Sequence, residues 1–250
     1  MRALKFIVIV FIALVLAASC SKTSVDCFSD PGNVVSEIRA LHDTVVFNSI
    51  EMYDNIDVEL VASNVNQIKV ITGENLMAGI STEMKDDTTL VIKNNNTCDI
   101  MRPGDRYFKV IVFYKQLNSI TYRSNGNLSS LGKITSNKFK IDIFEGSGKI
   151  DLELNTLESR LNYHFGTADL VVRGSSNVNY IYQVSYGPLH ASNLNTTFTY
   201  LETRSPNDCY VHADLELSAK INGPGDVFYS GNVENPALSG SGSGRLIRLD

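Results

Sequence analysis

Apolar and polar residues alternate along most of the second half of the chain, in short segments that each follow a tight turn. In residues 145–154, a Gly-Ser-Gly turn that ends at Gly148 leads into a strand-like segment. Its apolar residues occupy every second position and are Ile150, Leu152 and Leu154. Glycine suits turns that need a positive φ, and alternation with a period of two is typical of a half-buried β-strand. The pattern predicts a turn followed by a strand.

This turn-and-strand unit recurs at nearly constant spacing. Taking Gly148 as the anchor of its turn, equivalent anchors follow one another at intervals of 18 to 22 residues. The anchors in this series are Gly126, Gly148, Gly166, Gly187, Asn207, Gly225 and Gly244. Residues 54–60 repeat the register of residues 148–154, with Asp54 in place of the glycine. Asp tolerates left-handed backbone geometry better than most residues, so Asp54 is included among the turn anchors.

Equal spacing favours a repeat architecture over a flat β-sandwich, which does not require it. The positions two and four residues after each anchor are mostly apolar, and the position between them is polar or charged. The stacked coils of a solenoid need such columns, because each coil buries its inner face against the next. We predict an all-β fold, a β-helix or solenoid of roughly 20-residue repeats over residues 123–250. A β-sandwich is the alternative.

Residues 34–122 are expected to form a less regular β section that opens the solenoid, so that residues 34–250 make one continuous domain. Alternating, β-branched residues predict strands at 67–72, 89–93 and 107–114. Residues 73–87 are expected to form a loop with one helical turn. Residues 34–42 fit a strand or a short helix.

The N-terminus is expected to be a targeting segment rather than part of the fold. Two basic residues precede an unbroken apolar run, residues 6–16, which is too short to span a membrane as a helix. Small residues then lead to Cys20, an arrangement that resembles the lipobox of bacterial lipoproteins. We expect a signal peptide at residues 1–19, a lipid on Cys20 and a tether over residues 20–33. Ordinary secretory cleavage nearby is the alternative.

Three further cysteines remain if Cys20 is lipidated. An exported chain meets an oxidising compartment, where an odd number of cysteines allows at most one intramolecular disulfide. Cys209 lies two residues after its anchor, in a column of apolar residues, and is expected to be a buried, unreactive thiol. By elimination, Cys27 and Cys98 are the candidate disulfide pair.

The charge of the chain argues against a nucleic-acid-binding surface. It carries 22 basic and 27 acidic residues, for a formal net charge of −5. Nucleic-acid binding would require clustered Lys and Arg. Lys138 and Lys140 only alternate along one strand, which indicates a solvated strand face.

No set of residues predicts an active site, a metal site or a cofactor site. The histidines fall at different offsets from their anchors; they are His42, His164, His190 and His212. Asp151 and Asp169 share one offset and could form a carboxylate pair, but a solvated strand face is the better interpretation. Asp208 and Asp226 lie near anchors where some solenoids bind calcium, but basic residues follow other anchors directly.

Tyrosines in the repeats offer aromatic faces that could stack on sugars. They are Tyr180, Tyr182, Tyr186, Tyr200, Tyr210 and Tyr229. Most are expected in the core or in stacked ladders, and a minority on a broad side of the solenoid, where such folds usually bind ligands.

Several motifs in this order resemble the DUF2807 family, described as an auto-transporter adhesin "head GIN" domain. They are the Gly-x-Gly turns, the Asp-Asn-Ile-Asp-Val-Glu-Leu of residues 54–60, the Gly-Glu-Asn-Leu of residues 73–76 and the Lys-Val-Ile-Val of residues 109–112. The likeness covers about residues 44–249. It implies a right-handed β-helix similar to pectin-lyase-type solenoids, without their catalytic residues, on envelope lipoproteins of Bacteroidetes-like bacteria.

The resemblance implies a non-enzymatic, lipid-anchored protein of the cell envelope, with the outer membrane as its expected location and an adhesin-like or surface-interaction role. Its periplasmic or surface orientation stays open. A carbohydrate-binding or polysaccharide-modifying β-helix is one alternative, and a periplasm-facing scaffold or sensor partner is another. The expected partners are the membrane, through the lipid, and a glycan or protein ligand. Because the repeat runs almost to Asp250 without an evident cap, self-association through the solenoid ends is also expected.

Overall fold

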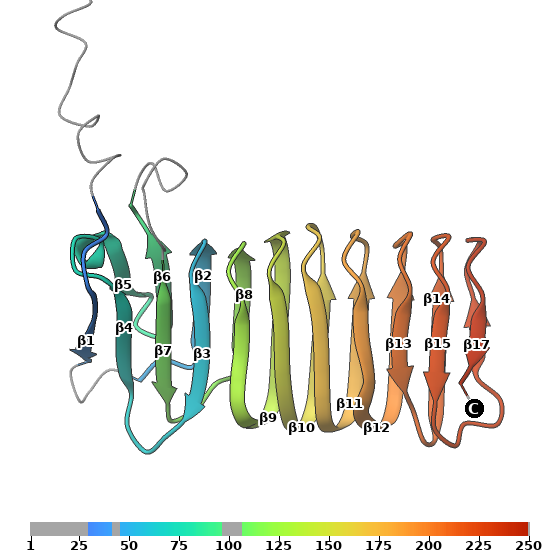
Figure 1. Ribbon diagram of the computed structural model, residues 1–250. Coiled ribbons are helices and arrows are strands. Elements are labelled where there is room, and N and C mark those ends of the chain that lie inside the picture. Colours follow the sequence, from blue (N-terminus) through green and yellow to red (C-terminus); the bar gives the residue numbers. More distant parts are fainter. Residues whose placement is uncertain (1–29, 42–45, 97–106, 250) are drawn as a thin grey trace, which may run out of the picture.

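The computed structural model describes residues 30–41, 46–96 and 107–249. These residues form coils that stack side by side along one axis, so the molecule is an elongated β-solenoid (Figure 1). Lys149 pairs with Asp169, twenty residues further along the chain, and the neighbouring coils keep similar offsets. The predicted all-β solenoid is therefore confirmed. Within the described ranges, no helix has the length and apolar character needed to cross a bilayer.

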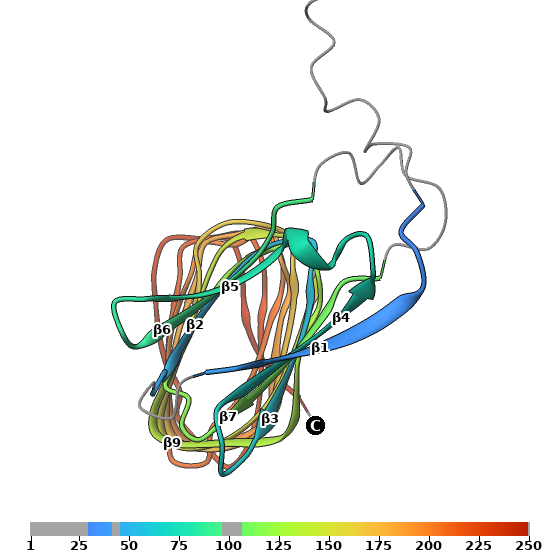
Figure 2. The same ribbon diagram turned by 90° about the vertical axis from the view of Figure 1, so that its left-hand side faces the viewer.

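Four long strands define the regular coils. They are β9 (Leu128–Gly146), β10 (Lys149–Tyr163), β11 (Asp169–Gln183) and β12 (Leu189–Thr203). Each is paired in parallel with the next, and each bends midway around a corner of the coil (Figure 2). The strand thereby passes from one broad face of the solenoid to the other. We call the face that holds the first halves of these strands face 2, and the face that holds their second halves face 1. A tight turn then leads back to face 2 in the next coil.

The remaining strands extend these two faces. Face 1 runs through β6 (Thr89–Asn94), β2 (Ser49–Asp54), β8 (Ser119–Ser124), the second halves of β9 to β12, β14 (Glu216–Ile221) and β16 (Ala237–Ser239). Face 2 runs through β4 (Gln67–Gly73), β7 (Lys109–Tyr114), β3 (Asp57–Ala62), the first halves of β9 to β12, β13 (Cys209–His212), β15 (Val227–Ser230) and β17 (Leu246–Arg248).

The N-terminal end differs from the coils because its outermost strands are antiparallel. β1 (Val34–Ala40) pairs with β4, and β5 (Ile80–Lys85) pairs with β6. A short 3-10 helix, η1 (Met77–Gly79), precedes β5. The open choice for residues 34–42 is thus settled as a strand as far as Ala40. The expectation of a loop over residues 73–87 is wrong for residues 80–85, which form β5.

The missed strand had a local signal in its turn. Asp86 and Asp87, in the three-residue connection between Lys85 and Thr89, both have a φ of 53°, a left-handed geometry that Asp adopts more readily than most residues. The strand itself is only half-buried, so its apolar alternation is weak. The helical turn expected in this segment is present as η1.

Inward-facing residues form apolar columns that run the length of the solenoid. One column on face 2 contains, in register, Val110, Val58, Leu128, Ile150, Leu170, Leu189, Cys209, Val227 and Leu246. All except Leu246, which is partly buried, are fully or almost fully buried. Burying one such side chain contributes about 1.5–3 kcal/mol, so the columns are the main source of stability.

The turn anchors fall into two rows rather than one. Gly126, Gly148, Gly187, Asn207, Gly225 and Gly244 share a row, in which Ala168 occupies the position expected for Gly166. Asp54 and Gly166 lie two residues earlier in the turn, at the level of Ser124 and Gly146. The positive φ expected of the anchors occurs at Asp54 (60°) and Gly166 (107°) but not at Gly148.

Close approach between coils, rather than positive φ, explains the glycine at position 148. A Cβ atom on Gly148 would collide with the carbonyl oxygen of Gly126 and the hydroxyl of Tyr122. That hydroxyl donates to the Gly126 carbonyl over 2.8 Å and accepts the Gly148 N–H over 3.0 Å. Burial raises the pKa of Tyr122 to about 12, so the hydroxyl stays protonated as both donor and acceptor.

Two further coils hold their turns in the same way. The buried Tyr163 hydroxyl donates to the Ala168 carbonyl over 2.7 Å, and the buried Gln183 amide donates to the Gly187 carbonyl over 3.0 Å. Tyr163 and Gln183 pair in register with each other. A buried polar side chain at the end of face 1 therefore satisfies turn backbone that the sheets leave unpaired.

The stacked core predicts a large difference between two leucines of β10. Leu161 is fully buried in a column, whereas the Leu157 residue is 62% exposed at the corner. We expect Leu161→Ala to lower the free energy of unfolding by about 2–5 kcal/mol, because it leaves a cavity. The matched control Leu157→Ala should change it by less than about 0.5 kcal/mol. Urea denaturation followed by circular dichroism measures both, and equal effects would contradict the stacked core.

Candidate functional site

Outward-facing residues on face 1 also stack in rows along the solenoid. One of them, the basic–aromatic row, contains Ser119, Lys140, Arg160, Tyr180 and Tyr200 in successive coils from β8 to β12. Paired strands lie roughly 4.8 Å apart, so neighbouring side chains in a row can contact one another. The row forms a continuous polar and aromatic strip across the regular coils.

The basic and aromatic side chains in this row cover one another's faces. The guanidinium carbon of Arg160 lies 4.6 Å from the centre of the Tyr180 ring. On the other side, the ring centres of Tyr180 and Tyr200 are 5.4 Å apart, with planes at 23°. Such cation–π and stacked arrangements are favourable. Because both faces of Tyr180 are occupied, a ligand can reach only its edge and hydroxyl.

A neighbouring row on face 1 centres on Asp142, whose side chain is only 11% exposed. Asp142 accepts hydrogen bonds from Lys140 (2.8 Å) and Asn162 (2.9 Å), and its carboxylate lies 3.2 Å from His164 Nε2. Burial by itself would raise the pKa of Asp142, but the bonds from Lys140, Asn162 and His164 outweigh it and hold the pKa below its ordinary value. Asp142 is therefore a fixed anion beside the basic–aromatic row.

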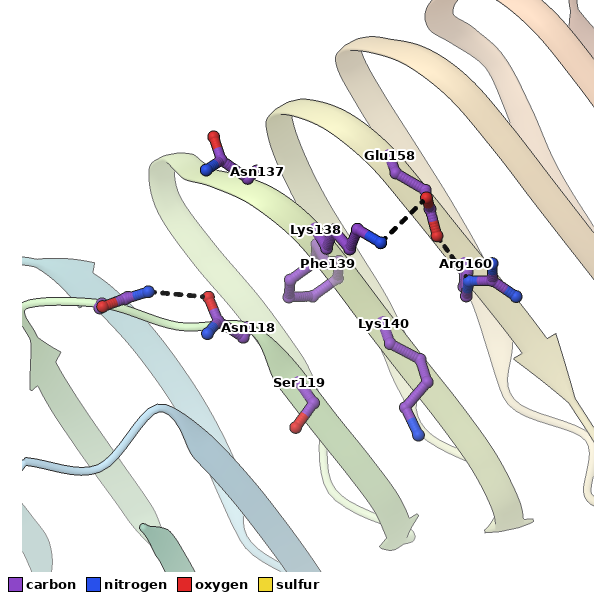
Figure 3. Close-up of a pocket in the computed structure, with 9 residues that line it drawn as sticks. Asn118, Ser119, Asn137, Lys138, Phe139, Lys140, Glu158 and Arg160 are labelled. Carbon is purple, nitrogen blue, oxygen red and sulfur yellow. Dashed lines mark hydrogen bonds and ion pairs between the residues drawn. The ribbon is translucent and has the colours of Figure 1, made fainter.

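A groove of about 530 Å³ lies at the start of the row, and we call it the junction groove (Figure 3). It is lined by Gln116, Asn118, Ser119, Asn137, Lys138, Phe139, Lys140, Glu158 and Arg160. An adjoining hollow shares Gln116 and Asn137 with the groove and adds Lys115, Asn155 and Leu157, among others. This volume is within the range of small-molecule sites.

The groove exists because β9 lacks a neighbouring strand over part of its length. β3 pairs with β9 only as far as Leu131, and β8 pairs with it only from Lys140 onward. Between these points, no described strand pairs with the side of β9 that faces the N-terminal end. The chain that joins β7 to β8 passes here and supplies Gln116 and Asn118. The start of the regular coils thus creates the groove.

Positive charge predominates in and around the groove. Four basic side chains line it and the adjoining hollow, against the single carboxylate of Glu158; they are Lys115, Lys138, Lys140 and Arg160. Arg160 and Lys138 converge on Glu158, at 2.7 and 3.7 Å (Figure 3). The hydrogen bond from Arg160, with support from Lys138, holds the pKa of Glu158 below its ordinary value. A local excess of positive charge on an acidic chain favours an anionic ligand.

Of the four cysteines, the structure describes only Cys209. Cys20, Cys27 and Cys98 lie outside the described residues, so the lipidation site and the disulfide pair stay predictions. Cys209 is fully buried in its column, and burial raises the pKa of its thiol to about 12. A thiol in this state is not a nucleophile, in agreement with the structural role expected for it.

The carboxylate pair that the sequence analysis considered and ranked below a solvated strand face does not form in the sheet register. Asp151 pairs with Val171, whereas Asp169 pairs with Lys149. Asp151 instead accepts a hydrogen bond from Arg173. The apparent match arose because Gly166 lies two residues early in its turn, which shifts every offset counted from it.

The described histidines and the two aspartates considered for calcium each have their own partners and do not form a common cluster. His164, His190 and His212 each lie beside a different aspartate: Asp142, Asp169 and Asp214. His42 lies outside the described residues. Asp226 forms an ion pair with Arg245, and its backbone N–H bonds to Asp208. Within the described ranges, no three His, Cys, Asp or Glu side chains gather as a metal site would require.

The tyrosines divide between surface ladders, a turn and the core. Tyr180 and Tyr200 belong to the basic–aromatic row, and Tyr182 contacts His164 beside it, with ring centres 5.7 Å apart. Tyr210 stacks between His190 and Phe228 on face 2. Tyr186 is exposed in a turn, and Tyr229 is buried.

The sequence pattern identified Tyr180 and Tyr200 but not the rest of the site. It predicted only a solvated face for Lys138 and Lys140, and it did not single out Arg160 or Asn118. Lys140, Arg160 and Tyr180 lie at different offsets from their glycine anchors, because the turns differ in length. A register counted from the inward apolar residues of face 1 would have aligned them.

Comparison with known proteins assigns the chain to a family. The model of the DUF2807 family, described as "Putative auto-transporter adhesin, head GIN domain", matches residues 46–233, which is most of the chain. The protein therefore belongs to the DUF2807 family. No curated protein matches it significantly.

Several solved structures share the fold. A "putative adhesin" from Bacteroides fragilis has a TM-score of 0.79 at 18% identity and covers 88% of this chain and 100% of its own. A "putative adhesin" from Parabacteroides distasonis has a TM-score of 0.66 at 19% identity, over 87% and 98%. A "Putative lipid binding protein" from the same species has a TM-score of 0.67 at 17% identity, over 88% and 98%. At these identities the likeness concerns the fold alone.

The bonded state of Asp142 predicts a pH dependence. Its folded pKa lies below the ordinary value for an aspartate, so its contribution to stability is complete above about pH 4 and is lost as the pH falls through the folded pKa. We expect acidification from pH 6 to pH 3 to cost the native protein about 1 kcal/mol more than it costs Asp142→Asn. Urea denaturation at both pH values tests this. Asp87→Asn, at an exposed turn, is the control, and equal pH dependence of the native protein and Asp142→Asn would refute the prediction.

Proposed function

We propose that this protein is a non-enzymatic, lipid-anchored protein of the bacterial cell envelope that acts in adhesion or surface interaction. The observation that carries the proposal is the match of residues 46–233 to a family described as an adhesin domain. The rigid faces with stacked outward rows suit such a role, because solenoids present extended surfaces to partners. Face 1, with the basic–aromatic row and the junction groove, is the proposed contact surface.

Lipid anchoring is supported by the sequence ahead of the solenoid. The apolar run of residues 6–16 and the small residues before Cys20 fit lipoprotein processing. A lipid on Cys20 would tether the N-terminal end of the solenoid to the outer membrane and leave faces 1 and 2 free along their length. On the periplasmic side the protein would act as a scaffold or sensor partner, and on the outside as an adhesin; protease treatment of intact cells distinguishes the two.

Carbohydrate binding is the second candidate, and the junction groove favours it. Its lining combines amide, hydroxyl and basic groups, and the adjoining hollow adds the exposed apolar side chain of Leu157. Ligand sites commonly join a few convergent polar groups to an apolar wall in this way. Modification of a polysaccharide would need acid and base groups at a cleavage point. Glu158, the carboxylate of the groove, is instead engaged by Arg160 and Lys138.

The anchor is tested by labelling cells with an alkyne analogue of palmitate. We expect Cys20→Ser to lose the label and leave the membrane fraction, while the matched variant Cys27→Ser keeps both. Retention of label by Cys20→Ser would disprove the lipid site. Protease treatment of intact cells then gives the orientation, because a protein that faces the periplasm survives it.

The contact surface is tested with beads coated with the protein and presented to immobilised cells, proteins and glycans. We expect Tyr180→Ala/Tyr200→Ala on face 1 to reduce attachment by about tenfold, because partly exposed aromatic residues are common energetic centres of interfaces. The control Tyr210→Ala/Phe228→Ala removes an equivalent stacked pair from face 2. Equal losses in the two variants would argue against face 1, and turnover of any polymer would argue against a non-enzymatic role.

A further inference from the structure

We propose that the junction groove binds an acidic saccharide, with its carboxylate or sulfate group held by Lys138 and Arg160. This inference rests on the proposed surface-interaction role and assigns a ligand class to the groove on face 1. Its basis is the combination of charge, amide groups and open backbone at one place on the solenoid.

Charge is the first part of the argument. The chain is acidic overall, at −5, yet four basic side chains and one carboxylate, Glu158, line the groove and its adjoining hollow. Lys140 is bonded to Asp142, so the two cations beside Glu158 are Lys138 and Arg160. The side chain of Lys138 is 79% exposed and that of Arg160 is 49% exposed, so both are accessible to a ligand in the groove. Glu158 lies between them and holds them in place. Lys138 and Arg160 can bind an anion while they stay bonded to Glu158, because Lys and Arg have several N–H donors each.

The uncharged lining is the second part. Gln116, Asn118 and Asn137 surround the groove, and Asn155 lies in the adjoining hollow. An amide group offers both donors and acceptors, which matches the hydroxyl groups of a sugar. Leu157, which is 62% exposed in the adjoining hollow, provides apolar surface for the C–H face of a sugar ring, whereas the Phe139 side chain is buried in the core. The set is richer in such groups than binding of a simple ion requires.

The open edge of β9 is the third part. Residues 132–139 pair with no described strand on the side toward the N-terminal end, so that edge of β9 is left open beside the groove. An extended peptide could pair with such an edge in principle. Here the strand bends around the corner of the coil, and Asn137 and Lys138 are both exposed in succession. A bent edge suits a compact polar ligand better than a straight added strand.

The basic–aromatic row gives the site a direction. Arg160 contacts both Glu158 in the groove and the ring of Tyr180 in the next coil. A chain of sugars that begins in the groove can continue along the edges and hydroxyls of Tyr180 and Tyr200. The acidic unit then sits in the groove, and the following units lie over β11 and β12.

The test measures binding by isothermal titration calorimetry on the full-length protein in mild detergent. The probes are polygalacturonate for carboxylates, heparin for sulfates, neutral dextran, and polyglutamate as an acidic peptide. We expect binding of at least one acidic polysaccharide, weakened by added salt, and none of dextran. Failure to bind either acidic polysaccharide, or equal binding of polyglutamate or dextran, would overturn the assignment.

Two matched double variants locate the site. Lys138→Gln/Arg160→Gln removes the two groove cations, and we expect it to weaken binding by about tenfold or more, as for loss of charged hydrogen bonds. Lys149→Gln/Arg245→Gln makes the same charge change on face 2, and we expect less than about a twofold effect. Equal weakening by both variants would show non-specific attraction and overturn the proposal. Bead attachment that persists without acidic-polysaccharide binding would overturn this inference alone, and the adhesive role would stand.

Discussion

In-register pairing between successive coils is the constraint on which the rest of this structure depends. Once Lys149 pairs with Asp169, every inward residue of β10 lies beside an inward residue of β11, and every outward residue beside an outward one. Apolar columns stabilise that register, because a shift of one residue would turn each column toward solvent. The buried hydroxyl of Tyr122 and the amide of Gln183 fix the turns in the same register.

The same pairing builds the surface. Arg160, Tyr180 and Tyr200 contact one another only because the core holds their coils in step. The long side chains of such a row lose little further freedom when a ligand arrives, since their neighbours already order them. The groove arises where this pairing is interrupted on the N-terminal side of β9, between Leu131 and Lys140. Order along face 1 and a gap in that order together make the candidate site.

The sequence predicts the architecture well because the core is periodic. Columns such as the one through Ile150 and Cys209 require apolar residues at fixed intervals, and that requirement is visible without a structure. The exact position of a glycine within each turn is not visible in the sequence. Gly166 lies in one row of the turns and has a positive φ, whereas Gly148 lies in the other row, where close contact with the neighbouring coil requires a glycine. The groove also escapes prediction. It depends on which strand ends where, and neither Lys138 nor Arg160 shows that locally.

The origin of the junction groove sets how the protein could be varied. Further coils added to the regular part would lengthen the basic–aromatic row, because each new coil contributes one residue to it. They would leave the groove unchanged, since it forms where the chain from β7 enters the stack and not within the repeat. The number of grooves per molecule and the length of the basic–aromatic row can therefore change independently. Evolution can extend the reach without changing the valency.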